Sequence, residues 1–242
     1  MFDKPKGLYA HQTDELIFSW KELLSERLVK VGNNYLSHVD PKLEGDLVLP
    51  NGLDGFYNLS FENCDFIYDI YLSQSFSGAI NTLAFSPSKG KKRIFFHPEN
   101  KCYITIDNCV VDLHKKCIIQ CFNNGKIPSD EGVTSIGHAS FSFTDYVEIT
   151  IPKQIEKIAS NAFSSCPTLS KLYFEDMGSN WYIKKKESYS YTDSYDYTRP
   201  SMMHTRVENL VYEPFDVSNP EKAIQTIRKV SSGETFIVKG KI

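Results

Sequence analysis

An internal repeat constrains the fold of this chain more than any other feature. From residue 155 to residue 174, apolar or small residues recur at fixed spacing: Ile155, Ile158, Ala162, Phe163, Cys166, Leu169, Leu172 and Phe174. The stretch that begins at residue 53 has the same pattern, with Ser60 in the place of Ala162: Leu53, Phe56, Phe61, Cys64, Ile67, Ile70 and Leu72. Because self-similarity of this kind indicates a stack of equivalent units, it predicts the architecture of the whole chain.

Two looser copies complete the array. The copy near residue 77 carries Ile80, Ala84, Phe85, Ile94 and Phe96, although Lys91 stands where the pattern has Leu169. The copy near residue 133 carries Val133, Ile136, Ser140, Phe141 and Val147, and its Ile149-Thr-Ile151 segment comes one residue early. We therefore expect four copies, beginning near residues 53, 77, 133 and 155.

Each copy ends on alternating apolar residues, which is typical of a half-buried strand. One unit cannot bury its own apolar face, so neighbouring units must stack. The stack predicts a parallel sheet on one side and Ala-Phe turns, such as Ala84-Phe85 and Ala162-Phe163, on the other. A strand-rich insertion, at about residues 97–127, separates the second copy from the third.

Several of these segments resemble a known family, the BspA-type leucine-rich repeat. The segments are Leu47-Val-Leu49-Pro50, Val133-Thr-Ser-Ile136-Gly137, Ile149-Thr-Ile151-Pro152 and Asn161-Ala-Phe-Ser-Ser-Cys166. The resemblance covers residues 43–176. It implies a right-handed α/β repeat solenoid of the leucine-rich repeat type, used for protein recognition and often found at bacterial surfaces. It brings no catalytic residues with it.

Caps are expected at both ends of the solenoid, because an open end exposes a sheet edge and core. In the N-terminal cap, residues 1–42, apolar residues at helical spacing predict an amphipathic helix: Leu16, Ile17, Trp20, Leu23, Leu24 and Leu28. In the C-terminal cap, residues 177–242, we expect a helix from Pro220 to Val230 and a strand from Glu234 to Val238. The Tyr-rich segment 184–200, which includes Tyr189 to Tyr197, is expected to be an exposed loop, either a variable insertion or a functional element.

Composition narrows the partners without identifying one. The formal net charge of -3 argues against a nucleic-acid or anionic-membrane binder, which would need a basic excess. No apolar stretch reaches the length of a signal peptide or of a membrane span. The chain as it stands is expected in the cytoplasm, or at the cell surface or secreted if a signal was removed. Its oligomeric state stays open.

The six cysteines are expected to be free thiols, because Cys64 and Cys166 occupy equivalent core positions in the repeat. The alternative is a zinc site at Cys109, His114, Cys117 and Cys121. Their spacing is irregular and they lie in apolar, strand-rich sequence, so we expect no metal. Neither a Cys–His nucleophile nor a phosphate-binding loop is indicated, and we expect no catalysis and no cofactor.

Strand alternation gives the best functional signal. If the apolar residues point inward, an outward set remains: Asp69, Tyr71, Arg93, Phe95, Glu148, Thr150, Lys171 and Tyr173. Tyr71, Phe95 and Tyr173 would form an aromatic stripe edged by charges, and such residues are enriched at protein interfaces. They could instead merely pair across strands or be covered by the caps. We predict a non-catalytic protein-interaction module, adhesin-like in character. The alternative is a carbohydrate-binding surface protein that uses exposed tyrosines.

Overall fold

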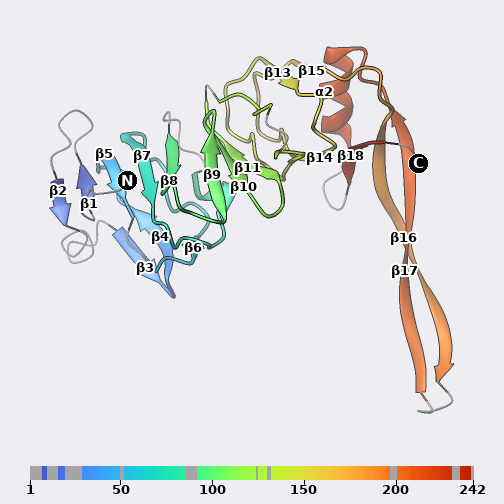
Figure 1. Cartoon of the computed structure of the whole chain (residues 1–242), viewed down its shortest axis with the longest axis horizontal. Coiled ribbons are helices and arrows are strands. Elements are labelled where there is room, and N and C mark those ends of the chain that lie inside the picture. The colour runs from blue at the N-terminus through green and yellow to red at the C-terminus, as the bar shows by residue number, and fades with distance from the viewer. Residues whose placement is uncertain are drawn as a thin grey trace.

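The computed structural model describes residues 7–9, 16–19, 29–49, 52–85, 92–123, 125–129, 132–196, 201–230 and 235–240. Strands stack along one long axis, and a two-stranded ribbon projects from the C-terminal end of the stack (Figure 1). The stack is the solenoid of parallel strands that the repeat predicts.

The strands that end the repeat copies form two parallel arrays. In the first array, β7 (Ile67–Leu72) pairs in parallel with β5 (Gly45–Val48) and with β8 (Arg93–Phe96). In the second, β13 (Glu148–Ile151) pairs in parallel with β15 (Lys171–Phe174). Ile149 lies opposite Leu172, so the one-residue-early register of this strand is confirmed.

The opposite side of the solenoid carries the short strands that begin the copies. There β6 (Gly55–Phe56) pairs in parallel with β4 (Tyr35–Val39), which also pairs with β3 (Val29–Gly32). Further along, β12 (Ser135–Ile136) lies in parallel between β11 (Cys117–Cys121) and β14 (Lys157–Ala159). Within each copy the chain therefore passes from one parallel array to the other, and the core lies between the two.

Equivalent contacts recur between neighbouring copies. The Phe61 amide donates to the Ala84 carbonyl over 2.8 Å, and the Phe141 amide donates to the Ala162 carbonyl over 3.0 Å. Phe61 also stacks on Phe85, which belongs to the 3-10 turn Thr82–Phe85. The predicted stacking of Ala-Phe turns is thus confirmed.

Cys64 and Cys166 have equivalent surroundings in their copies. Both side chains are buried, and their thiols donate to the carbonyls of Val39 and Phe141. Burial raises the pKa of Cys64 to about 12 and also raises that of Cys166. They are small core residues, as the repeat predicts.

The insertion between the second and third copies is a three-stranded antiparallel unit. It contains β9 (Tyr103–Ile106), β10 (Cys109–Asp112) and β11. Cys109 and Cys121 lie opposite each other in the β10–β11 pair and form a disulfide. The prediction of six free thiols was therefore wrong: Cys64, Cys102, Cys117 and Cys166 remain thiols. Sequence spacing could not reveal this pairing, because it depends on the cross-strand register.

The N-terminal segment differs from its prediction. Residues 16–19 are not helical: β2 (Leu16–Ser19) pairs with β1 (Gly7–Tyr9), which pairs antiparallel with β5. β1 hydrogen-bonds the outer edge of the first sheet, and this tertiary pairing overrides the helical spacing of the sequence. Residues 20–28 of the predicted helix lie outside the described residues.

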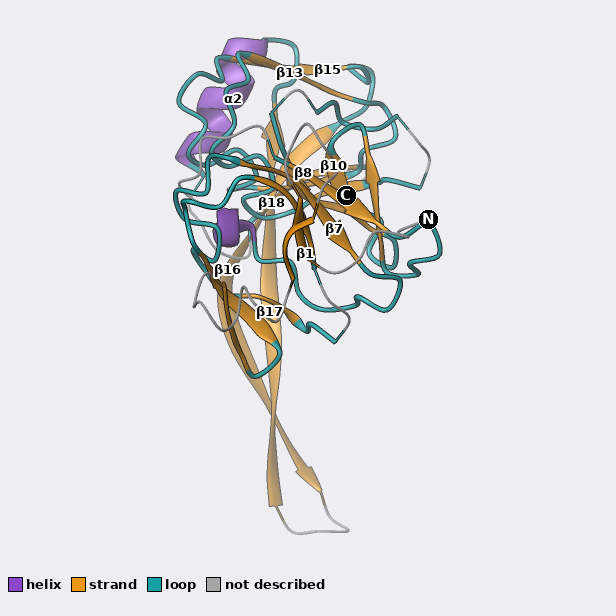
Figure 2. Ribbon diagram, turned by 90° about the vertical axis from the view of Figure 1, so that its left-hand side faces the viewer, coloured by secondary structure: helices purple, strands orange, loops and turns teal. Residues whose placement is uncertain are grey.

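The C-terminal helix is confirmed as α2 (Pro220–Lys229), whose first turn is capped by the Asn219 side chain accepting from the Lys222 amide. Ala223, Ile224 and Ile227 are buried. The helix packs beside β15, and the side view shows it flanking the β13–β15 pair (Figure 2). The strand β18 (Phe236–Lys239) joins β14 to β16 and extends the sheet across the end of the solenoid.

The Tyr-rich segment is a strand rather than a loop. It lies in β16 (Trp181–Asp196), which pairs antiparallel with β17 (Ser201–Phe215) to make the projecting ribbon. Tyr and Thr favour strands, and β17 supplies the backbone partners that local sequence does not reveal. Residues 197–200 lie outside the described residues.

Candidate interaction face

The first half of the predicted face is formed by two neighbouring strands. Asp69 lies opposite Arg93, and Tyr71 lies opposite Phe95, on β7 and β8. Their neighbours Ile70, Leu72 and Ile94 are buried. Arg93 is exposed and Tyr71 and Phe95 are half-buried, as the alternation predicts, whereas Asp69 is buried. We call Asp69, Tyr71, Arg93 and Phe95 the aromatic patch.

The aromatic patch is held by specific contacts. The rings of Tyr71 and Phe95 stack with centroids 5.3 Å apart and an interplanar angle of 19°. Arg93 donates from Nε to Asp69 Oδ1 over 2.8 Å and from Nη2 to Asp69 Oδ2 over 2.7 Å. Its guanidinium carbon also lies 5.3 Å from the Phe95 centroid, within range of a cation–π contact. The hydrogen bonds with Asp69 raise the pKa of Arg93 above its ordinary value.

This geometry gives a preorganised surface. Bidentate pairing fixes the plane of the guanidinium, yet the Arg93 side chain keeps 52% of its surface exposed. Asp69 is buried beneath it. A partner meeting the patch finds two stacked rings and an oriented cation, so little side-chain entropy remains to be lost on binding.

The second half of the predicted face lies on β13 and β15. Glu148 lies opposite Lys171, with Lys171 Nζ 3.2 Å from Glu148 Oε1, and Thr150 lies opposite Tyr173. The hydrogen bond with Glu148 raises the pKa of Lys171. We call Glu148, Thr150, Lys171 and Tyr173 the second patch.

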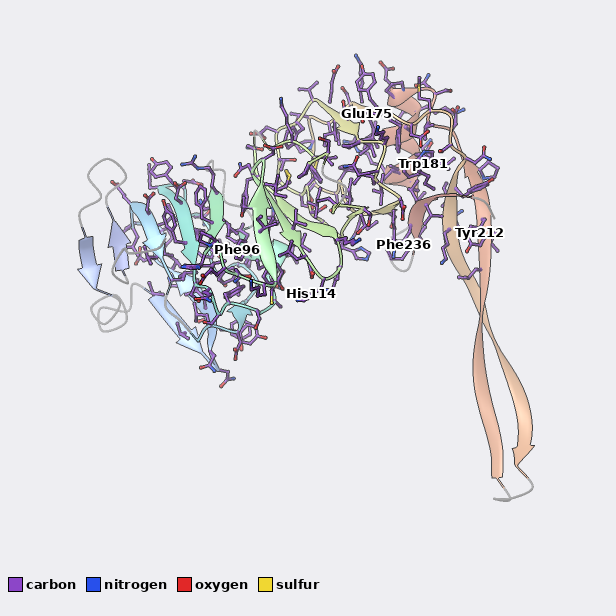
Figure 3. The ribbon with its side chains drawn as sticks, in the orientation of Figure 1. Phe96, His114, Glu175, Trp181, Tyr212 and Phe236 are labelled. Atoms are coloured by element: carbon purple, nitrogen blue, oxygen red, sulfur yellow. A yellow bond between two sulfur atoms is a disulfide. The ribbon has the colours of Figure 1, made fainter. Side chains whose placement is uncertain are left out.

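The structure does not join the two patches into one stripe. β8 ends the first sheet, whereas β13 and β15 form a separate two-stranded sheet. Phe96, at the end of β8, and Glu175, directly after β15, lie well apart along the array (Figure 3). Tyr173 therefore has no place beside Tyr71 and Phe95, because the β9–β11 insertion comes between the copies that carry them.

A groove of about 760 Å³, which sequence reasoning missed, borders the second patch. It lies between β13 and residues 125–129, the segment that leads from the insertion into the third copy. The lining residues are Asp107, Gly125, Lys126, Ile127, Ser129, Phe141, Tyr146, Glu148, Ile149, Thr150, Pro152 and Glu175. The only sequence features related to this groove were the length of the insertion and the irregular register of Ile149, and neither feature predicts a groove.

A charged side chain lies in the core of the copies that begin near residues 53 and 77. Lys92 is 1% exposed, and its ammonium donates to the Cys64 carbonyl. Burial lowers its pKa from 10.5 to about 8. Because a partner cannot reach this buried side chain, we assign Lys92 no binding role.

The zinc alternative is not supported by the geometry. Two of its sulfurs, those of Cys109 and Cys121, are joined to each other. In the part of the chain that the structure describes, no group of three or more His, Cys, Asp and Glu side chains could hold a metal ion. No described helix is long and apolar enough to cross a membrane.

The fold and the repeat define the class of protein: this is a leucine-rich repeat solenoid. Residues 89–194 match the family described as the BspA type leucine rich repeat region, in six copies. Over these residues the chain is similar to a repeat scaffold of a kind that typically mediates protein interactions. The resemblance seen in the sequence is confirmed, although the family model counts six copies where the sequence pattern predicts four.

Among solved structures, the chain is similar to a leucine-rich repeat protein from Eubacterium ventriosum, with 17% identity and a TM-score of 0.37. The alignment covers 54% of this chain and 42% of the other, so the chain spans less than half the length of that protein. A comparison with curated proteins finds no match.

Proposed function

We propose that this chain is a non-catalytic protein-interaction module whose partner binds the aromatic patch. The observation that carries the proposal is the Tyr71–Phe95 stack, which the Arg93–Asp69 pair borders. Tyr and Arg, together with Trp, are enriched among the residues that dominate binding energy at protein interfaces. The rings already lie in a fixed arrangement, which favours tight contact.

The second patch contributes less in this proposal. The Lys171–Glu148 ion pair is partly exposed on both sides, and such pairs add little binding energy. Tyr173, which is 37% exposed, is its best candidate contact. Binding therefore depends mainly on Tyr71 and Phe95, with Arg93 orienting the partner and Lys171 assisting.

We further propose that the protein has an adhesin-like role outside the cytoplasm. The Cys109–Cys121 disulfide supports it, because disulfides persist in oxidising compartments and are rare in the cytosol. Cell fractionation with thiol-specific labelling of the protein as isolated tests this point. Recovery of both cysteines as thiols from a cytoplasmic fraction contradicts it.

The binding experiment compares Tyr71→Ala and Phe95→Ala with the control Tyr57→Ala. Tyr57 is exposed, whereas Tyr71 and Phe95 are half-buried; like them it pairs with an aromatic ring, that of Tyr35, but it lies outside the patch. A photo-crosslinking residue at position 95 captures the partner, whose affinity is then measured for each variant. We expect losses of about 2 kcal/mol for the patch variants, roughly thirtyfold in Kd, and an unchanged affinity for Tyr57→Ala.

The same variants distinguish the carbohydrate alternative, which the flat Tyr71–Phe95 stack also suits. A glycan array is probed with the wild type and with Tyr71→Ala. Glycan binding that Tyr71→Ala removes, without a protein partner, replaces the protein-interaction proposal. Undiminished binding of the partner to both patch variants refutes the assignment of the face.

A further inference from the structure

The outward sheet of the solenoid is interrupted beside β13. β13 pairs with β15 on one side, and no described strand pairs with its other side. In a regular solenoid the preceding copy would supply a strand there. In this chain residues 125–129 line the groove with β13 and join no sheet.

The hydrogen bonds to β15 determine which backbone groups of β13 face the gap. The Lys171 amide donates to the Val147 carbonyl, and the Glu175 amide donates to the Ile151 carbonyl. In a parallel pair, bonding to one neighbour alternates along the strand, so residues 147, 149 and 151 face β15. Glu148 and Thr150 therefore present their amides and carbonyls to the groove. Across the described residues, no backbone partner meets them on that side.

The opposite wall of the groove is fixed by other contacts. The Tyr146 hydroxyl lies 2.9 Å from the Phe122 carbonyl and also contacts the Gly125 carbonyl. The Lys126 amide donates to the Asp107 carbonyl over 3.0 Å, and Gln154 Nε2 donates to the Pro128 carbonyl over 2.7 Å. These bonds tie the segment to the insertion and to residues on either side of β13, so the position of this wall is fixed by the fold.

We propose that this groove binds an extended peptide segment of a partner protein, which adds as a strand to the free edge of β13. Strand addition takes its affinity from backbone hydrogen bonds and its specificity from alternate side chains. The groove offers the donors and acceptors of Glu148 and Thr150 along its edge. Its volume lies within the usual range of ligand sites, about 300–1,000 Å³.

The lining selects basic side chains in that peptide. Three acidic residues, Asp107, Glu148 and Glu175, line the groove with one basic residue, Lys126. Lys171 pairs with the Glu148 carboxylate, so Asp107 and Glu175 carry the charge preference. The floor is apolar, from Phe141, Ile149 and Ile127. A segment that alternates Lys or Arg with apolar residues meets both features, because alternate side chains of a strand point to opposite faces. This site is independent of the aromatic patch.

The experiment uses a labelled synthetic peptide of alternating Lys and Val, followed by fluorescence anisotropy with the full chain. Thr150→Pro removes the amide that faces the groove and leaves the bonds to β15 in place. Asp107→Asn removes a lining charge, and its positive φ of 48° suits Asn. Glu62→Gln, at an exposed carboxylate outside the groove, is the control. An alternating Glu and Val peptide tests the charge preference.

We expect the Lys peptide to bind, the Glu peptide to bind about tenfold more weakly, and Thr150→Pro to weaken the Lys peptide about tenfold. Asp107→Asn should weaken it several-fold and reduce its salt dependence, whereas Glu62→Gln should not. Slower hydrogen exchange at the Thr150 amide on peptide addition is expected too. The proposal is overturned if both peptides bind equally or if the Lys peptide does not bind. It is also overturned if Asp107→Asn and a folded Thr150→Pro both keep the wild-type affinity. If Thr150→Pro unfolds, Asp107→Asn and the exchange measurement decide.

Discussion

The ammonium of Lys92 is enclosed in the core, and replacing this residue with Met measures what its charge costs the fold. Its pKa is about 8 in the folded protein against an ordinary value of 10.5. A difference of this size corresponds to about 3 kcal/mol that opposes folding when the amine is protonated. In return, the ammonium donates to the Cys64 carbonyl. Loss of that bond costs about 1–3 kcal/mol, so at neutral pH the net effect of Lys92→Met is small.

The pH dependence is the sharper observable. The unfolded chain keeps the Lys92 proton up to about pH 10.5, whereas the folded chain releases it above about pH 8. The unfolded state therefore binds more protons in this window, and stability rises with pH. Each pH unit above 8 adds about 1.4 kcal/mol. Above about pH 9 the Cys64 thiol opposes the gain, because the folded state holds its proton to about pH 12.

Urea unfolding followed by tryptophan fluorescence, from about pH 7 to about pH 9, tests the argument. We expect the free energy of unfolding to rise by about 1.4 kcal/mol more in the wild type than in Lys92→Met. Lys42→Met, at an exposed lysine, is the control and should follow the wild type. Parallel pH profiles for the wild type and Lys92→Met refute the reasoning.

Three further outcomes are expected. Gly125→Ala should lower stability by about 1–3 kcal/mol in thermal unfolding, because the added Cβ would lie 2.7 Å from the Asp107 carbonyl oxygen. The control Gly178→Ala should change stability by no more than about 0.5 kcal/mol, because its added Cβ has no neighbour closer than 3.9 Å. Replacing Cys109 and Cys121 together with Ser should cost about 3 kcal/mol in urea unfolding, since their separation of 12 residues closes a short loop, and an unchanged midpoint would contradict the disulfide. Iodoacetamide should label Cys64 in the native protein far more slowly than in urea, because burial raises its pKa to about 12; equal rates by mass spectrometry would show that the site opens freely.

The sequence was enough to predict the repeat and the faces of its strands. Side-chain alternation is a local property of a strand, so the pairing of Tyr71 with Phe95 and of Thr150 with Tyr173 followed from aligned copies alone. The start of α2 was equally local, because Asn219 and Pro220 provide the cap and first turn. The one-residue-early position of Ile149 was visible for the same reason.

Tertiary structure decided what depends on partners distant in sequence. β1 pairs with β5, and β17 pairs with β16, so two segments expected as helix and loop are strands. The Cys109–Cys121 disulfide depends on a cross-strand register, and the burial of Lys92 depends on the packing around Cys64. The separation of the two patches and the open edge of β13 arise because the insertion interrupts the sheet. Local residue patterns determine which way a side chain points, whereas the set of neighbours around it exists only once the whole chain is folded.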